Sequence, residues 1–173
     1  IVLRHVAESA TQRLMLEKGD IDIANKLSPD DHDALAANPD IAKLTGLSGT
    51  IYYMGLNTRN GLLGNEKFRE AMKYLVDYQG IADTISMEVH QTMIPRGFLG
   101  ALDYNPYSYD LEKAKALMAE AGVTGDTSFN MVVWNTPPYT DFAQAIQATM
   151  ASAGITLNLE VVDGKQWLTR YRN

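Results

Sequence analysis

The sequence contains no cysteine, which excludes disulfide bonds, thiolate metal sites and a cysteine nucleophile. This absence does not identify a compartment, because reducing and oxidising locations both accept cysteine-free proteins. No apolar run approaches the ~20 residues of a membrane-spanning helix, so we expect no direct membrane insertion. Basic residues are also few, since 15 Lys and Arg against 21 Asp and Glu give a net charge of −6. Nucleic acid is therefore not expected as a partner.

Catalytic and metal-binding patterns are missing as well. The three histidines, His5, His32 and His90, are far apart, and none has the spacing of a metal ligand. Asp20 and Asp22 point to one side of an expected strand, but no matching acid or nucleophile accompanies them. No glycine-rich segment has the spacing and lysine of a phosphate loop, and no Gly-x-Ser-x-Gly elbow occurs. The sequence therefore predicts no catalytic, metal or cofactor site.

What the sequence does contain is a strand followed by an amphipathic helix. Residues 50–57 are apolar on both alternating faces, which is typical of a strand inside an α/β sheet. A helix over residues 65–78 follows, with Asn65 as its N-cap and an apolar stripe that includes Leu75. Leu75 is expected deep in the core. Arg69 is expected to bridge an acidic or carbonyl partner in a structural role.

Strands and helices alternate along the rest of the chain. We expect one α/β lobe over residues 1–173, with a mixed, mostly parallel sheet and helices on both faces. Ser9, Ser28 and Asp110 are the expected N-caps of three further helices. The remaining expected strands cover residues 1–6, 20–24, 41–45, 128–134 and 155–161; the remaining expected helices cover residues 10–18, 29–38, 81–89, 110–121, 140–153 and the segment after Asp163.

Four motifs carry a resemblance to a known family. They are Leu16-Glu-Lys-Gly-Asp-Ile-Asp22-Ile23, the Ser28-Pro-Asp30 helix start, Tyr53-Met-Gly-Leu-Asn-Thr-Arg59, and Tyr109-Asp-Leu-Glu-Lys-Ala-Lys-Ala-Leu-Met-Ala-Glu-Ala-Gly122. In this order and spacing the chain resembles extracellular solute-binding proteins, the class that includes the dipeptide- and oligopeptide-binding components of ABC importers. The chain departs from the family pattern at Leu62-Leu63 and at Asp77-Tyr78, which touches a loop and a helix surface.

The resemblance implies a function and a location. It implies the carboxyl-side lobe of a two-lobe binding protein with the type II periplasmic-binding fold. Such a protein closes by hinge motion on a peptide or similar small solute and delivers it to an ABC permease. The implied location is the periplasmic or extracellular face of a bacterial envelope. Because the sequence starts without Met and stops within an expected helix, we expect a fragment of a longer protein. An α/β enzyme lobe and a sensory binding module without a transporter are the alternatives.

The ligand site is predicted from the ends of strands. In open α/β sheets, ligands meet the loops beyond the carboxyl ends of strands. The free N–H groups at the start of the helix near Thr140 favour a carboxylate or another acceptor. Trp134 has an equally plausible packing role at the sheet edge. The residues predicted to bind ligand are Asn57, Thr58, Arg59, Trp134, Asn135, Thr136 and Tyr139.

Overall fold

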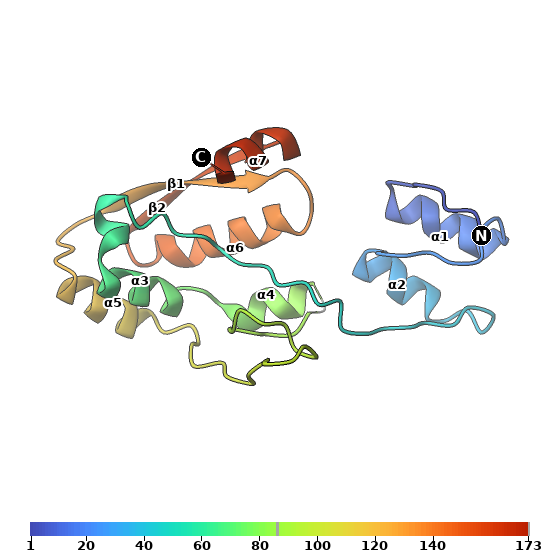
Figure 1. Ribbon diagram of the computed structural model, residues 1–173, viewed down its shortest axis with the longest axis horizontal. Helices are drawn as coiled ribbons and strands as arrows, with labels where there is room; N and C mark the ends of the chain where they lie inside the picture. Colours follow the sequence, from blue (N-terminus) through green and yellow to red (C-terminus); the bar gives the residue numbers. More distant parts are fainter. Residues whose placement is uncertain (86, 173) are drawn as a thin grey trace. The chain divides into compact units, whose positions relative to one another are not determined.

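The computed structural model describes residues 1–85 and 87–172, and the chain forms two compact units (Figure 1). Unit 1 covers Ile1–Ser48, and unit 2 begins at Gly49. Whether both units belong to one lobe of a longer protein stays a prediction. The described residues contain no helix with the length and apolar character needed to span a bilayer.

Unit 1 is built from two short helices that pack against each other. They are α1 (Ser9–Lys18) and α2 (Pro29–Leu35), and α1 ends at Gly19 with a left-handed φ of 76°. The strands expected at residues 1–6, 20–24 and 41–45 do not form. Alternation of polar and apolar residues specifies a strand only where a neighbouring strand accepts its hydrogen bonds, and the described part of unit 1 has no such neighbour.

Two serines join the helices of unit 1. Ser28 caps α2 as predicted, because its hydroxyl accepts from the backbone N–H of Asp31 at 3.2 Å. The predicted cap of α1 is wrong, since Glu8 occupies the N-cap position and makes no side-chain cap. The hydroxyl of Ser9 instead accepts from the backbone N–H of Ser28 at 2.7 Å.

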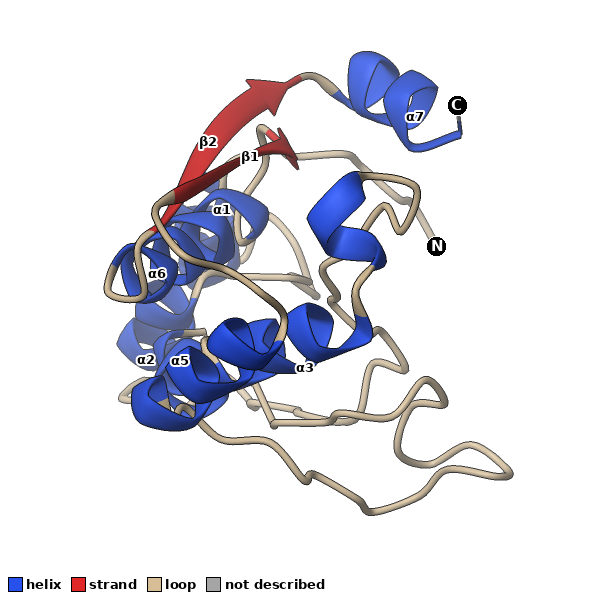
Figure 2. Cartoon of the chain, turned by 90° about the vertical axis from the view of Figure 1, so that its left-hand side faces the viewer, coloured by secondary structure: helices blue, strands red, loops and turns tan. Residues whose placement is uncertain are grey.

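The sheet of unit 2 is a parallel pair of strands, β1 (Thr127–Trp134) and β2 (Ile155–Val162). Their register places Thr127 opposite Ile155 and Trp134 opposite Val162. The connecting helix α6 (Tyr139–Ala151) completes a β-α-β unit, which Figures 1 and 2 show. The sequence predictions for both strands and for this helix are therefore confirmed to within two residues at each end.

Helices lie on both faces of this sheet, as predicted. Helix α6 contacts both strands, and its Ile146 and Met150 share a core cluster with Ile155. Helix α7 (Gly164–Arg172) covers the opposite face beside the carboxyl end of β1 (Figure 1). An ion pair between Arg170 and Glu160 ties α7 to that face. The α/β class is confirmed.

The segment 50–57 is not a strand, so this expectation is wrong. It is extended but belongs to no ladder, and in Figure 1 it runs opposite to β1. Met54 and Leu56 pack against the core, whereas Tyr53 is 60% exposed. One side of the segment therefore packs against the core, and the other side exposes Tyr53. Among the described residues only the β1–β2 pair forms a sheet, so the larger mixed sheet is not present in them.

The core of unit 2 lies between α6, the sheet and the packed helices α3 (Glu66–Tyr74) and α5 (Leu111–Glu120). Asn65 caps α3 and Asp110 caps α5, as predicted. Leu75 is fully buried, which confirms its expected place. The largest fully buried side chains are Phe68, Leu75, Met150 and Ile155.

Helix α3 is shorter than expected, because a second capping residue follows it. The side chain of Asp77 accepts from the N–H of Gly80 at 3.0 Å and starts α4 (Tyr78–Thr84), three residues earlier than the predicted helix. The 3-10 helix η1 (Gly61–Gly64) precedes α3. Arg69 donates to the carbonyl of Gly64 at 2.8 Å and to that of Leu63 at 3.0 Å, which confirms its carbonyl-bridging role.

Candidate functional site

Four of the predicted ligand residues gather where β1 ends and α6 begins. The backbone N–H of Asn135 donates to the carbonyl of Val162 at 2.9 Å, which continues the pairing of β1 with β2 by one residue. The N–H of Tyr139 donates to the carbonyl of Thr136 at 3.0 Å, and this turn leads directly into α6. Asn135 and Thr136 are exposed, while Trp134 and Tyr139 are half-buried. Polar loop atoms and two large rings therefore lie side by side at the carboxyl end of the sheet.

The other three predicted residues form a separate turn. The side-chain oxygen of Asn57 accepts from the backbone N–H of Arg59 at 3.1 Å. The backbone carbonyl of Asn57 accepts from the N–H of Asn60 at 3.0 Å. Asn57, Thr58 and Arg59 are all exposed. The carbonyl of Thr58 lies so close to Gly64 that a Cβ there would approach it to 2.9 Å. The turn is thus tightly packed on one side and open to solvent on the other.

The structure does not bring these two groups together. The ring of Tyr52 lies 5.3 Å from that of Tyr139, and Asn57 follows five residues later along an extended segment, about 16 Å away. Asn65 follows the turn in the sequence, and its side chain donates to the carbonyl of Ala121. Ala121 lies shortly before Thr127, the first residue of β1. The turn therefore lies toward the amino end of β1 (Figure 1). Predicting one site from both groups assumed that residues 50–57 run parallel to β1, and they do not.

An aromatic cluster surrounds the carboxyl-end group. Trp134 lies 5.2 Å from Tyr139 and 6.2 Å from Trp167, measured between ring centroids. Trp167 stacks on Tyr171 at 4.9 Å with an angle of 10° between the ring planes. Edge contacts extend the cluster to the segment 50–57. We define the aromatic cluster as Tyr52, Trp134, Tyr139, Phe142, Trp167 and Tyr171.

Trp134 is the centre of this cluster. Its indole contacts rings of α6 and α7, and Gly164 approaches it so closely that a Cβ there would lie 3.3 Å from its Nε1. Aromatic pairs of this kind contribute beyond the area they bury. These contacts give Trp134 a packing role between the end of the sheet and both helices. Its contact with a ligand stays a prediction.

Tyr52, a member of the aromatic cluster, and its neighbour Tyr53 connect the segment 50–57 to α6 and α7. The hydroxyls of Tyr53 and Tyr171 are 2.6 Å apart, and this hydrogen bond raises the pKa of Tyr53, with burial adding to the shift. Burial raises the pKa of Tyr52, and the neighbouring Tyr139 raises it further. Both phenols are therefore neutral at ordinary pH and able to donate hydrogen bonds.

Sequence reasoning missed most members of this cluster. Trp167 and Tyr171 are four residues apart on an expected helix, so their shared face was readable from the sequence. Their meeting with Tyr53 and Trp134 depends on long-range packing, which no spacing reveals. Within the described ranges, no group of three metal-ligating side chains occurs.

Comparison with known proteins gives a consistent result over the whole chain. The family "Bacterial extracellular solute-binding proteins, family 5 Middle" matches residues 1–173. The probable D,D-dipeptide-binding periplasmic protein DdpA of Escherichia coli K12 is 30% identical over 167 residues, which are 92% of this chain and 32% of that protein. The glutathione-binding protein GsiB of Salmonella choleraesuis is 25% identical and matches 96% of this chain and 33% of its own length.

Solved structures agree with these sequence relatives. HbpA2 from Haemophilus parasuis has a TM-score of 0.79 at 28% identity, covering 96% of this chain and 35% of that one. The ABC transporter-associated periplasmic binding protein DppA from Helicobacter pylori, in complex with the peptide STSA, has a TM-score of 0.78 at 27% identity, covering 96% and 33%. The chain thus spans about a third of the length of these relatives.

Proposed function

Since the chain belongs to the family 5 bacterial extracellular solute-binding proteins, we propose that it is part of the substrate-binding component of an ABC importer. The family match over all 173 residues is the observation that carries this proposal. The protein captures a peptide or similar small solute, performs no catalysis, and delivers the solute to a membrane permease. It works at the periplasmic or extracellular face of a bacterial envelope.

The proposed ligand follows from the relatives and from the side chains near α6. Relatives are named for binding dipeptides and glutathione, and one neighbouring structure holds a tetrapeptide. Asn135 and Thr136 are exposed, and amide and hydroxyl groups suit the donors and acceptors of a peptide backbone. Tyr139 adds a ring and a hydroxyl beside them. Mixed polar and aromatic linings of this kind are typical of small-molecule sites.

We propose that these residues form one side of a site shared with the rest of a longer protein. Binding sites in two-lobe proteins lie between the lobes, so a single piece leaves part of the ligand in water. Losing half of a −8 kcal/mol interaction takes a micromolar ligand to about the millimolar range. In calorimetry, the full-length protein is expected to bind a short peptide at micromolar concentration, and the 173-residue chain is expected to show no titration there. Tight binding by the 173-residue chain would contradict the shared site.

Variants of the full-length protein test the residues. Tyr139→Ala and Asn135→Ala are expected to weaken peptide binding about tenfold, equivalent to one lost hydrogen bond or ring contact of about 1.4 kcal/mol. The control is Thr156→Ala, an exposed residue of β2 near the amino end of the sheet. Asn57→Ala tests the separate turn, and unchanged affinity would remove that turn from the site. Unchanged affinity in both Tyr139→Ala and Asn135→Ala would place the ligand elsewhere.

A transport measurement separates importer from other roles. With the permease in proteoliposomes, the full-length protein and its ligand are expected to stimulate ATP hydrolysis, and Tyr139→Ala should shift the ligand concentration required. Peptide binding without any stimulation would favour a sensory binding protein. Consumption of the peptide by the protein alone would favour an enzyme.

A further inference from the structure

The ring of Tyr139, the first residue of α6, is flanked by two other rings of the aromatic cluster. The ring centroid of Tyr52 lies 5.3 Å away with an angle of 64° between the planes, and that of Trp134 lies 5.2 Å away at 34°. The side chain of Tyr139 is half-buried. Because two aromatic neighbours already contact this ring, little of its surface is left for a solute to stack on.

Both neighbours are held by further rings. Tyr52 also lies 5.1 Å from Phe142, which follows Tyr139 by three residues and therefore lies on the same side of α6. Trp134 lies 6.2 Å from Trp167 of α7, with an angle of 24° between the planes. These contacts give the ring of Tyr139 a defined place between the end of β1, helix α6 and the segment 50–57.

The hydroxyl of Tyr139 has surroundings that differ from those of its ring. It forms no hydrogen bond with any group of residues 1–85 and 87–172, whereas the hydroxyls of Tyr53 and Tyr171 bond to each other at 2.6 Å. Asn135 and Thr136 are exposed in the loop directly before it. A phenol hydroxyl donates one hydrogen bond, so the hydroxyl of Tyr139 is available to an acceptor beside these amide and hydroxyl groups.

Gly164, the first residue of α7, leaves room for the indole of Trp134. A Cβ at Gly164 would lie 3.3 Å from Nε1 and 3.5 Å from Cε2 of this indole. At the shorter distance the indole would have to move by a few tenths of an ångström. Since the indole contacts the ring of Tyr139, such a movement also displaces the hydroxyl of Tyr139.

We propose that Tyr139 binds the solute through its hydroxyl alone, and that Gly164 is a positioning residue that sets the place of this hydroxyl through Trp134. The inference rests on the proposed function, in which the loop before α6 meets the solute. The hydroxyl donates to a carbonyl or another acceptor of the solute, and no ring of the solute stacks on Tyr139. An acceptor at this position is therefore required of the solute, and an aromatic side chain is not.

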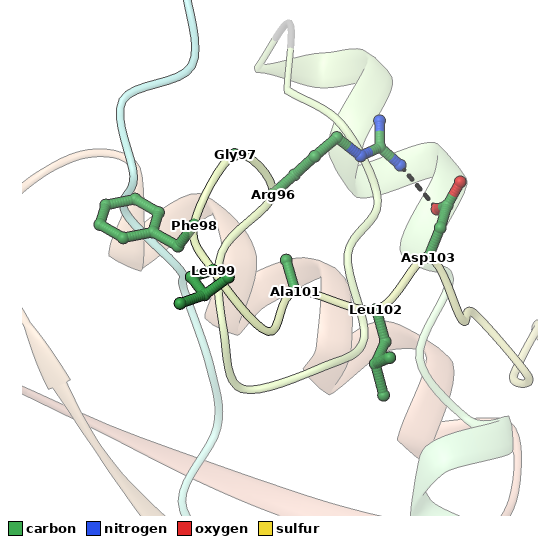
Figure 3. A pocket seen from close by; sticks show the side chains of 7 residues that line it. All are labelled: Arg96, Gly97, Phe98, Leu99, Ala101, Leu102 and Asp103. Atoms are coloured by element: carbon green, nitrogen blue, oxygen red, sulfur yellow. Dashed lines mark hydrogen bonds and ion pairs between the residues drawn. The ribbon is translucent and has the colours of Figure 1, made fainter.

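A hollow in the loop between α4 and α5 offers a different place for a solute (Figure 3). Its volume is about 580 Å³. Arg96 in its lining is paired with Glu88 and with Asp103, the latter at 2.9 Å. The lining includes no residue of the aromatic cluster, so a solute held in this hollow would leave the affinity insensitive to the hydroxyl of Tyr139.

Removal of the hydroxyl from the full-length protein tests the proposal. The probe is a pool of tetrapeptides, the length held in one neighbouring structure, and the peptides that the native protein retains are then titrated by calorimetry. Tyr139→Phe keeps the ring and is expected to weaken binding about tenfold, as much as Tyr139→Ala. The matched control is Tyr104→Phe, which removes the hydroxyl of a tyrosine that is 62% exposed in another loop. This control is expected to leave the affinity unchanged.

Gly164→Ala tests the positioning role. It is expected to weaken binding about threefold in the native protein, and less than about 1.5-fold once Tyr139→Phe is present, because the hydroxyl that it displaces is then missing. It is also expected to shift the tryptophan emission, since Trp134 moves. The control is Gly125→Ala, because a Cβ at Gly125 would meet nothing within 4 Å. A threefold loss that persists in the Tyr139→Phe background would assign Gly164 a general structural role and overturn its positioning role.

The other outcomes separate the hydroxyl from the ring and from internal contacts. Affinity of Tyr139→Phe equal to that of the native protein overturns the proposal, and so does a loss in Tyr139→Ala that is confined to aromatic peptides. A lower melting temperature of Tyr139→Phe without a change in affinity would assign the hydroxyl to a partner inside the full-length protein, which also overturns it. A native protein that binds no peptide of the pool contradicts the proposed function itself. If the native protein binds peptides and Tyr139→Phe binds them equally well, only this inference fails.

Discussion

Units 1 and 2 are stabilised in different ways. Unit 2 has a continuous core in which Phe68, Leu75, Met150 and Ile155 are fully buried. Leu35 is the one buried hydrophobic residue that the described part of unit 1 contributes. Unit 1 relies more on polar contacts, centred on Ser28 and its neighbours. The same local signals for helix ends thus operate in both units, but only one unit adds extensive apolar burial.

This difference has a consequence for unfolding. Burial of apolar area is the dominant favourable contribution to folding, and polar contacts add about 1 kcal/mol each. Unit 2 is therefore expected to unfold cooperatively as a whole, while unit 1 opens at lower free energy. Hydrogen exchange resolved by residue distinguishes the two, because it measures opening of each helix separately.

The largest effect is expected from Leu75→Ala in the core of unit 2. The side chain is fully buried and belongs to the main core cluster. Its truncation is expected to lower the free energy of unfolding of unit 2 by about 2–5 kcal/mol through lost apolar transfer and a residual cavity. Chemical denaturation followed by tryptophan fluorescence measures this, since both tryptophans lie in unit 2.

A control in unit 1 sharpens the same comparison. Leu35→Ala is expected to increase exchange in α1 and α2 while leaving the fluorescence transition of unit 2 unchanged. If Leu35→Ala shifted that transition as much as Leu75→Ala does, the two units would share one cooperative fold, and the contrast between them would be wrong.

Helix caps give a smaller and directly matched pair of effects. Asn65 accepts from the N–H groups of Lys67 and Phe68, and Ser28 accepts from that of Asp31. Replacing such caps by alanine costs about 0.5–2 kcal/mol. Asn65→Ala is expected to lower the stability of unit 2 by that amount, and Ser28→Ala is expected to affect exchange only in unit 1. If either variant lowered hydrogen-exchange protection in both units, the two units would not open independently of each other.

The parts of the fold predicted from sequence are those that short-range chemistry determines. Ser28, Asn65 and Asp110 cap their helices, and Gly19 ends α1, because each acts on backbone groups within a few residues. The β1-α6-β2 unit was also predictable, since its strands and helix follow each other directly. Segment 50–57 was not, because a strand needs a partner that the sequence pattern does not specify.

The candidate site shows the same limit. The loop after β1 could be predicted as a candidate because it follows a predicted strand and leads into a predicted helix, and its role in binding stays a prediction. The turn at Asn57 was combined with it on the assumption of parallel strands, and the observed direction of the segment separates them. The cluster around Trp134 includes rings from four parts of the chain. Only their packing in three dimensions, not their spacing, brings Tyr52 and Trp167 to one place.

The smallest effect is expected from Asp31, and it is defined by pH. Hydrogen bonds with the hydroxyls of Ser9 and Ser28 lower the pKa of this carboxyl, and the charge of Arg13, 3.2 Å away, lowers it further. A carboxyl with a lowered pKa in the folded state stabilises that state above its unfolded pKa of about 3.9. The contribution is lost as the pH falls through the folded pKa. Asp31→Asn is therefore expected to weaken exchange protection of α1 and α2 at pH 6.5, with the difference from the native chain shrinking as the pH falls below the unfolded pKa of about 3.9.

The matched control for this test is Asp30→Asn. Asp30 lies in the same first turn of α2, so its replacement removes the same charge from the same helix end. The two variants therefore differ in the contacts of Asp31 with Ser28 and Arg13. Asp30→Asn is expected to change protection less than Asp31→Asn at pH 6.5. Equal losses would assign the effect to the helix end, and a loss in Asp31→Asn that does not shrink at all as the pH falls below the unfolded pKa of about 3.9 would show that the ionised carboxylate is not its cause.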